Sequence, residues 1–170
     1  MKKDGYWVRL TSFVLILVLF LLLPFFSVRG GDTHFNFGLE LSGHVIPYFG
    51  LSYMSGVREF GFNLGFGLPG DLAGFRFNDL AYEGTVYYRY DFINTDFYPR
   101  VHLRALSAPL SAEEDTFLLM LGGGLGYLYS PSRFRFGGGI ELNLGLPVSA
   151  LDRFSGPIPY LSLETSYEFS

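Results

Sequence analysis

Two short segments of the chain carry residue types that could perform nucleophilic chemistry. Glu40, Ser42 and His44 stand at alternate positions in the first segment, and His102 stands between two arginines in the second. A serine nucleophile needs a histidine base and an orienting carboxylate within hydrogen-bonding reach. Alternate residues of an extended strand share a face but lie about 7 Å apart. These residues therefore do not form a triad by themselves, and we expect that the protein is not an enzyme.

Other charged and glycine-rich segments lack the spacing of a cofactor site. His, Asp and Glu residues show no metal-ligand spacing, and the chain has no cysteine. Gly122–Gly124 and Gly137–Gly139 are not followed by a helix, as a phosphate loop requires. We expect them to face each other across two strands and to permit sharp curvature. The acidic run Glu113–Asp115 is expected to be a solvated loop. No catalytic residue, cofactor or metal is predicted.

The elements that hold these residues are predicted to be strands. In the last segment, Tyr160–Ser170, apolar residues alternate with Ser and Glu, which is the pattern of a strand with one apolar face. A strand of about ten residues is long enough to cross a membrane. Eight segments from Phe35 onward share this alternation, and no helical periodicity of useful length is found. They cover residues 35–42, 49–53, 60–68, 82–92, 100–105, 117–129, 134–146 and 160–170.

The lengths of the connections test this assignment. A hairpin loop with an even number of residues switches the outward face between odd and even positions, and an odd loop keeps it. A two-residue turn at Gly56-Val57, with Gly first as a type II′ turn requires, pairs Tyr53 with Phe60 and Leu51 with Phe62. A three-residue loop near His44–Ile46 keeps the face between the first two strands, as the pattern demands.

The remaining connections alternate between short and long. Four-residue connections at 93–96 and 130–133 switch the face, and the second one pairs Tyr129 with Phe134. Short turns at one end and longer loops at the other are typical of outer-membrane barrels with both termini in the periplasm. The long connections are Pro69–Leu80, Ser107–Asp115 and Pro147–Pro159.

The N-terminal residues have the features of a secretory signal peptide. Lys2, Lys3 and Arg9 precede the apolar run Phe13–Phe26, and we expect cleavage after Gly30. An uncleaved anchor helix is the alternative interpretation. Of the 12 basic and 16 acidic residues, four basic and one acidic precede position 31, so the remainder has eight arginines, fifteen acidic residues and a net charge of −7. Such an acidic body does not favour nucleic-acid binding.

The apolar face could point into a ligand cavity, as in a lipocalin-like carrier, or outward to lipid. Two features favour lipid. Glycines crowd the polar face, where the narrow interior of an eight-stranded barrel needs small residues. Aromatic residues gather at the strand ends, where a membrane barrel has its girdle: Tyr53, Tyr88, Tyr90, Phe92, Tyr127, Tyr129, Phe134, Phe136, Tyr167 and Phe169.

The polar face then forms the barrel interior. Buried charges must be paired, and the interior of eight strands has room only for side chains. We therefore predict a plug of ion pairs rather than a pore, with Asp91 diagonal to Arg100 and Glu83 diagonal to Arg104. The predicted interior set is Glu40, Glu83, Arg89, Asp91, Arg100, His102, Arg104, Arg135, Glu141, Glu164 and Glu168.

Over residues 35 to 170 the chain resembles the small outer-membrane barrels of the OmpA/OmpX type. The resemblance rests on the signal peptide, the eight alternating strands and a closing strand with Tyr167 and Phe169 outward, although Ser170 follows the terminal aromatic residue. With the signal peptide at 1–30, the resemblance implies an all-β domain at 31–170. This domain is expected to be an eight-stranded antiparallel up-and-down transmembrane barrel. Outer-membrane lipid and the barrel-assembly machinery, which reads the closing strand, are the implied partners.

The predicted function is a structural or adhesive role in the bacterial outer membrane, through outer loops whose partner is unknown. Two alternatives stay open. One is a soluble secreted barrel that binds an apolar ligand. The other is an outer-membrane enzyme acting on lipid, which would depend on His44 or His102.

Overall fold

A computed structural model describes most of the chain after position 30. The described residues are 31–42, 45–67, 70–72, 75–77, 81–92, 95–111, 114–146 and 157–169. The predicted signal peptide with its cleavage after Gly30, the residue His44 and most of the 147–159 connection lie outside them. No helix in the described part of the chain is long and apolar enough to cross a membrane.

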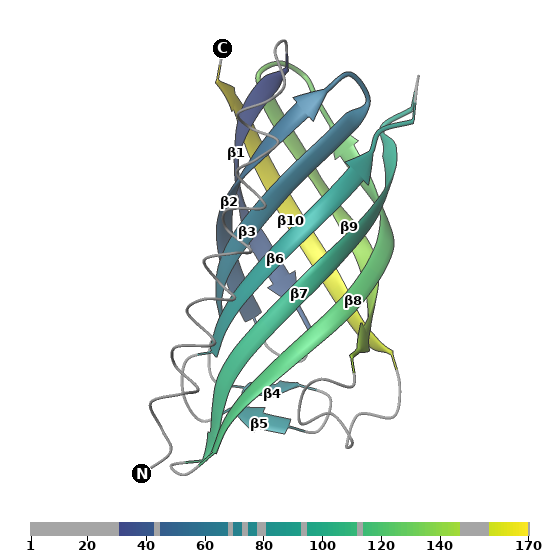
Figure 1. The fold of residues 1–170 in the computed structure, drawn as a ribbon. Coiled ribbons are helices and arrows are strands. Elements are labelled where there is room, and N and C mark those ends of the chain that lie inside the picture. The colour runs from purple at the N-terminus through teal and green to yellow at the C-terminus, as the bar shows by residue number, and fades with distance from the viewer. Residues whose placement is uncertain are drawn as a thin grey trace. The chain divides into compact units, whose positions relative to one another are not determined.

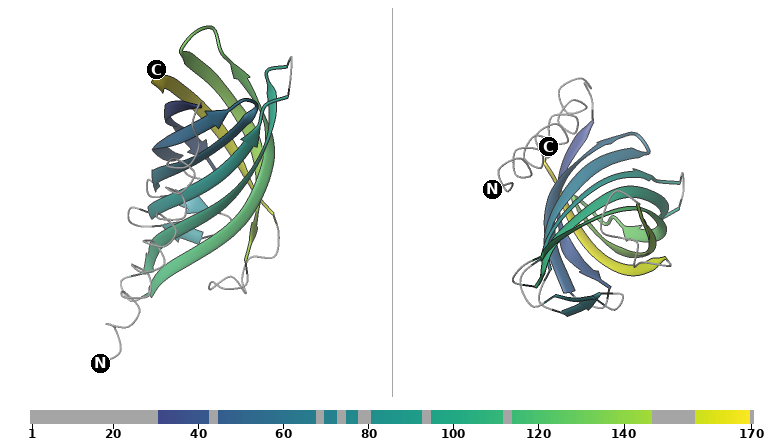
Figure 2. Two further views of the ribbon diagram at one scale, coloured as in Figure 1. Left: turned by 45° about the horizontal axis from the view of Figure 1, so that its top comes forward. Right: turned by 60° about the horizontal axis from the view of Figure 1, so that its bottom comes forward.

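Eight strands form a closed antiparallel barrel, as predicted from the alternating pattern (Figure 1). Each strand pairs with its neighbours along the chain, and the last strand pairs with the first, for example at Leu39 and Leu163. The closed ring is visible from one end in Figure 2. The barrel strands are β1 (Asp32–Leu41), β2 (Val45–Ser55), β3 (Arg58–Gly67), β6 (Ala81–Tyr90), β7 (Phe97–Ser111), β8 (Glu114–Tyr129), β9 (Phe134–Gly145) and β10 (Ile158–Phe169).

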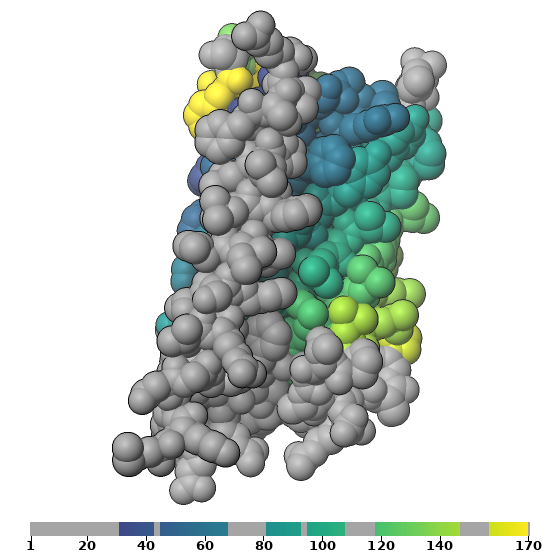
Figure 3. Space-filling model, in the orientation of Figure 1, coloured from purple at the N-terminus to yellow at the C-terminus, as the bar shows by residue number. Residues whose placement is uncertain are grey.

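Alternation along each strand separates an apolar outer face from a polar inner face. In β3, burial changes with every residue from Arg58 to Phe62, because successive side chains point to opposite sides of a sheet. Of the predicted apolar set of β3, Phe60, Leu64 and Phe66 are exposed and Phe62 is half-buried. On one face of the molecule, outward side chains from β3, β6 and β7 lie side by side (Figure 3). The apolar face therefore points outward, which does not fit a carrier with an internal apolar cavity.

The turn between β2 and β3 and the connection between β8 and β9 lie at the barrel end where β1 begins and β10 ends (Figure 1). At Gly56-Val57 the predicted two-residue turn is confirmed, because Ser55 pairs with Arg58. Gly56 has a φ of 62°, a left-handed conformation that glycine adopts without a Cβ penalty. Register follows from this turn, and the predicted pairs of Tyr53 with Phe60 and Leu51 with Phe62 are present.

Two other connections also test the predicted register. Around 93–96 the backbone N–H of Phe92 donates to the Phe97 carbonyl at 3.4 Å, as a four-residue connection requires. The first connection has the predicted odd length, but it lies between the paired residues Leu41 and Val45, two positions earlier than expected.

The predicted pairing of Tyr129 with Phe134 is wrong by two residues. Tyr129 pairs with Phe136, and Phe134 pairs instead with Tyr167 of β10. The end of β10 thus pairs with the start of β9 at Phe134, and just before it the backbone N–H of Glu168 donates to the carbonyl of Arg133 at 2.9 Å. A shift of two residues keeps every side chain on its predicted face.

The same shift changes which glycines meet. The glycine segments 122–124 and 137–139 do not face each other as predicted, because Gly124 pairs with Glu141. Gly139 pairs with Gly126 instead.

The predicted loop Ser107–Asp115 is instead the end of a long hairpin. β7 continues to Ser111 and β8 begins at Glu114, whereas β6 pairs with β7 only as far as Ser107. Pro109 is tolerated because this part of β7 has lost its β6 partner, and an edge position does not need its N–H. The 69–80 connection likewise contains two short paired strands, β4 (Gly70–Leu72) and β5 (Phe75–Phe77).

Candidate functional site in the barrel interior

The inward face of the barrel holds most of the ionisable side chains of the described residues. Alternation of the strand places them there, since inward positions alternate along each strand with outward positions, most of which are apolar. Asp91 and Glu168 lie at the rim and are partly exposed. The fully buried charged residues are Glu40, Glu59, Glu83, Arg89, Arg100, Arg104, Arg135, Glu141 and Glu164. All of these except Glu59 belong to the predicted interior set.

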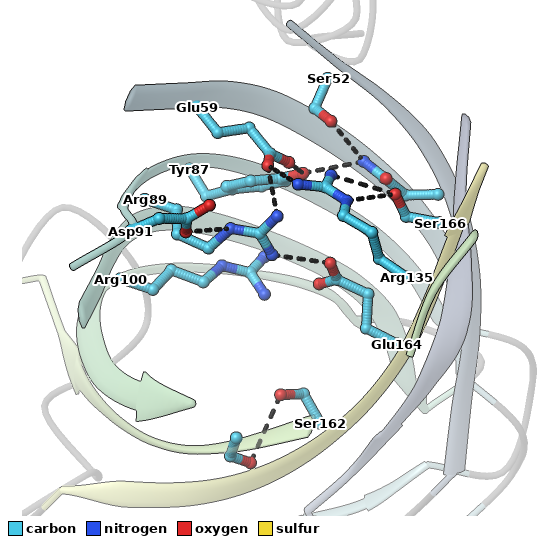
Figure 4. Close-up of polar contacts among 12 residues, drawn as sticks. Ser52, Glu59, Tyr87, Arg89, Asp91, Arg100, Arg135, Ser162, Glu164 and Ser166 are labelled. Carbon is cyan, nitrogen blue, oxygen red and sulfur yellow. Dashed lines mark hydrogen bonds and ion pairs between the residues drawn. The ribbon is translucent and has the colours of Figure 1, made fainter. Parts of the chain in front are cut away.

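Four of them form a cluster toward the barrel end where β1 begins and β10 ends, which we call the terminal cluster: Glu59, Arg89, Arg135 and Glu164. Arg89 contacts the Glu59 carboxylate and places its Nη1 2.7 Å from Glu164 Oε1 (Figure 4). Arg135 approaches the same Glu59 carboxylate at 2.8 Å. Asp91 adds a longer contact of 3.5 Å to Arg89, not to Arg100 as its diagonal position had suggested. The cluster joins strands β3, β6, β9 and β10 across the lumen.

Neutral hydrogen-bond partners fix the Glu59 carboxylate. Tyr87 donates its hydroxyl to Glu59 Oε1 at 3.0 Å, and Asn36 donates to that hydroxyl at 2.8 Å. Asn36 also donates to Ser52 Oγ at 3.1 Å. On the other side Arg135 donates to Ser166 Oγ through Nε and Nη2. Glu59 is thus the centre of a network that sequence reasoning missed.

A second group, the central cluster, surrounds Arg104: Glu40, Glu83, Arg100, Arg104 and Glu141. Arg104 lies 2.7 Å from Glu40, 3.2 Å from Glu83 and 3.1 Å from Glu141. Arg100 Nη1 lies 3.1 Å from the other oxygen of Glu141. The predicted diagonal contact between Glu83 and Arg104 is therefore present.

Three buried arginines each lie over the ring of an inward tyrosine. A guanidinium is attracted to an aromatic face, and this attraction strengthens when water is excluded. The distances from the guanidinium carbon to the ring centre are 4.6 Å for Arg89 and Tyr98, 4.2 Å for Arg100 and Tyr87, and 3.9 Å for Arg104 and Tyr160.

Glycines make room for these rings. A Cβ at Gly61 would collide with the Tyr87 ring, and one at Gly126 would collide with the Tyr98 ring. The expectation that small residues fill the narrow interior beside a few large ones is met at these positions.

The interior becomes apolar toward the opposite end of the barrel, where β1 ends and β10 begins. Its ion pairs give way to an apolar cluster in which every side chain is at most 3% exposed. Its members are Ile46, Ala81, Leu106, Leu118, Met120, Ile158 and Tyr160.

The residues considered for nucleophilic chemistry are engaged elsewhere. Ser42 donates its hydroxyl to the Pro159 carbonyl at 2.8 Å, and Glu40 belongs to the central cluster. His102 Nε2 lies 2.6 Å from Asn143 Oδ1 and 3.6 Å from Glu141. Within the described ranges no group of three or more His, Asp or Glu side chains is placed to hold a metal ion. The absence of an enzymatic activity stays a prediction.

Comparison with solved structures gives the fold class. Neisserial surface protein A is 16% identical over 83% of this chain and all of its own, with a TM-score of 0.50. The N-terminal barrel domain of Pseudomonas aeruginosa OprF is 12% identical over 82% of this chain and all of its own, with a TM-score of 0.54. A major outer membrane protein of Thermus thermophilus is 12% identical over 83% of this chain and all of its own, with a TM-score of 0.51.

The chain has the fold of the small eight-stranded outer-membrane β-barrels, as the sequence pattern predicted. No protein-family model and no curated protein matches its sequence.

Proposed function

We propose that the protein is an outer-membrane barrel with a filled, non-conducting interior and a structural or adhesive role. The observation that carries the proposal is the reversal of ordinary burial: apolar side chains cover the outside and paired charges fill the inside. Each barrel strand contributes at least one exposed large apolar residue. A surface of this kind is unfavourable in water and suits hydrocarbon.

The ends of this surface support the proposal. At the barrel end where β1 begins and β10 ends, exposed phenylalanines pack on half-buried tyrosines, such as Phe60 on Tyr88 at 4.7 Å between centroids and Phe134 on Tyr167 at 4.8 Å. Rings at this level suit the headgroup region. Tyr53, also predicted for the girdle, is buried instead. The exposed aromatic residues at this end are Phe60, Phe92, Phe97, Tyr127, Tyr129, Phe134, Phe136 and Phe169.

The interior supports a barrel without a channel. Ion pairs of the terminal and central clusters cross the lumen from opposite strands, and the apolar cluster follows them toward the other end. Purified protein in a planar bilayer should therefore give no discrete conductance steps. Regular single-channel steps would contradict this part of the proposal.

The adhesive role rests on the connections at the barrel end opposite the start of β1. The hairpin of β7 and β8 continues past the last pairing of β6, so its backbone extends beyond the barrel wall. A surface partner would meet this hairpin first, together with β4 and β5. Replacing residues 108–116 by a two-residue turn, which keeps Ser107 paired with Phe117, should abolish adhesion by expressing cells, while the amount of protein in the outer membrane stays unchanged.

The location is tested by fractionation and gel mobility. Protein extracted from the outer-membrane fraction should migrate differently before and after boiling in SDS, because a folded barrel resists the detergent. A soluble protein without this shift would favour the secreted carrier. The enzyme alternative predicts a lipid modification that His102→Ala or His44→Ala abolishes.

A further inference from the structure

The central cluster contains one more carboxylate than guanidinium among the described residues. Glu40, Glu83 and Glu141 face only Arg104 and Arg100. All five side chains are at most 5% exposed, so water does not compensate the difference. An uncompensated buried charge costs several kcal/mol.

The terminal cluster does not share this excess. Its two fully buried carboxylates, Glu59 and Glu164, are matched by Arg89 and Arg135. The remaining acid near it, Asp91, keeps 26% of its side chain exposed and can stay ionised in water.

His102 is poorly placed to supply the missing positive charge. Its neighbours on the inward face of β7 are Arg100 and Arg104, and a second positive charge between them would be repelled. Its Nε2 lies 2.6 Å from the amide oxygen of Asn143 and 3.6 Å from Glu141, but its Nδ1 has no hydrogen-bond partner among the described residues, so a second proton there would be buried and unpaired.

Glu40 is the carboxylate with the weakest compensation. Glu141 contacts both arginines, and Glu83 accepts a hydrogen bond from the Thr85 hydroxyl at 3.0 Å in addition to its contact with Arg104. Glu40 has only the contact of Oε2 with Arg104, and its Oε1 has no partner among the described residues. The strands beside it place Ile46 on one side and Ser162 on the other.

Unsatisfied polar atoms mark the same place. Glu83 Oε2 and the Tyr160 hydroxyl are buried and make no hydrogen bond within the described part of the chain. Tyr160 lies under Arg104, 3.9 Å from its guanidinium carbon to the ring centre. A proton on Glu40 would let its carboxyl group donate one hydrogen bond to an unpaired acceptor of the cluster, such as Glu83 Oε2, and buried polar groups are costly when unpaired.

We propose that Glu40 holds a proton at neutral pH and that the central cluster is a proton-binding site inside the barrel. The carboxylate takes one proton from water during folding and becomes a neutral acid. Two carboxylates, Glu83 and Glu141, then face two guanidiniums, Arg100 and Arg104. The charged and titratable groups around Glu40 are these four together with the Tyr160 hydroxyl.

Infrared difference spectroscopy of the folded barrel in detergent tests the proposal directly. At pH 7 the wild-type protein should show the carbonyl stretch of one buried protonated carboxylic acid, and Glu40→Gln should remove it. Glu164→Gln and His102→Gln should leave it in place. Absence of the band in the wild type, or its survival in Glu40→Gln, would overturn the proposal.

The pH dependence of stability gives a second readout. An unfolded Glu is ionised near neutral pH, so the folded state would bind one more proton and become less stable as pH rises. The unfolding equilibrium constant should increase about tenfold per pH unit in the wild type through this group. This contribution should disappear in Glu40→Gln and persist in Glu164→Gln. If the wild-type protein lacks the carbonyl band, and its stability depends on Na⁺ but not on choline, a bound cation compensates the extra carboxylate. That result would refute the proposal.

Discussion

At the scale of single residues, the interior depends on a few side chains with several partners each. The Glu59 carboxylate forms ion pairs with Arg89 and Arg135 and accepts a hydrogen bond from the Tyr87 hydroxyl. Breaking a buried pair by removing one partner leaves an uncompensated charge, which costs more than the pair itself contributes. Residues of this kind should therefore dominate the response of the barrel to mutation.

Glu59→Gln should lower the free energy of unfolding by about 3–5 kcal/mol, because two buried guanidiniums lose their shared anion. Glu168→Gln, at the partly exposed rim, should change it by less than about 0.5 kcal/mol. Urea unfolding of both variants in lipid vesicles measures the difference. Equal stabilities would show that the terminal cluster contributes nothing specific.

Gly126→Ala should destabilise the barrel by about 1–3 kcal/mol, because its Cβ would overlap the Tyr98 ring. A double-mutant cycle with Tyr98→Ala checks this cause. Loss of the ring should remove most of the penalty at position 126. A cost that persists without the ring would mean that the backbone, not Tyr98, excludes the methyl group.

At the scale of the strands, period-two alternation correctly predicted which face of each strand points outward and which points into the barrel. Burial of one face and exposure of the other leave no freedom for a one-residue slip, so Tyr53 and Phe60 pair as expected. A two-residue slip keeps the faces, and for this reason alternation could not find that Phe136, not Phe134, pairs with Tyr129.

Strand ends were harder to predict than strand faces. Pro109 and its neighbours favour a loop by composition, yet an edge hairpin accommodates them. Glu59 lies one position before the predicted third strand, which begins at Phe60. Continuing the alternation of that strand by one residue places Glu59, like Gly61 and Asn63, on the inward face. Ion pairs between strands that are distant in sequence could not be predicted from alternation alone. They depend on the closure of the barrel, which brings the inward side chains of these strands together across the lumen.

The turn at Gly56 makes a prediction about a single element. Gly56→Ala should cost about 1–2 kcal/mol, because its φ of 62° places a Cβ in the disfavoured left-handed region. Gly84→Ala is the matched control, since an added Cβ there meets no atom within 4 Å. Unfolding of the two variants side by side should show a loss only for Gly56. The same loss at both positions would argue against a strained turn.

At the scale of the whole molecule, the account rests on an inside-out distribution of polarity. Charged side chains line the lumen, and apolar side chains such as Leu64, Leu125 and Leu163 cover the wall with exposures of 45%, 67% and 49%. A wall of this composition is stable only where hydrocarbon replaces water. The central claim is therefore that these outward residues contact lipid.

Because the chain contains no cysteine, a single introduced cysteine reports its own position without background. A spin label on Leu64→Cys, Leu125→Cys or Leu163→Cys, in protein folded into vesicles, should be accessible to oxygen and shielded from a water-soluble nickel complex. A label at Val57→Cys in the turn should show the opposite preference. Accessibility of all four labels to the nickel complex would contradict the membrane-spanning barrel.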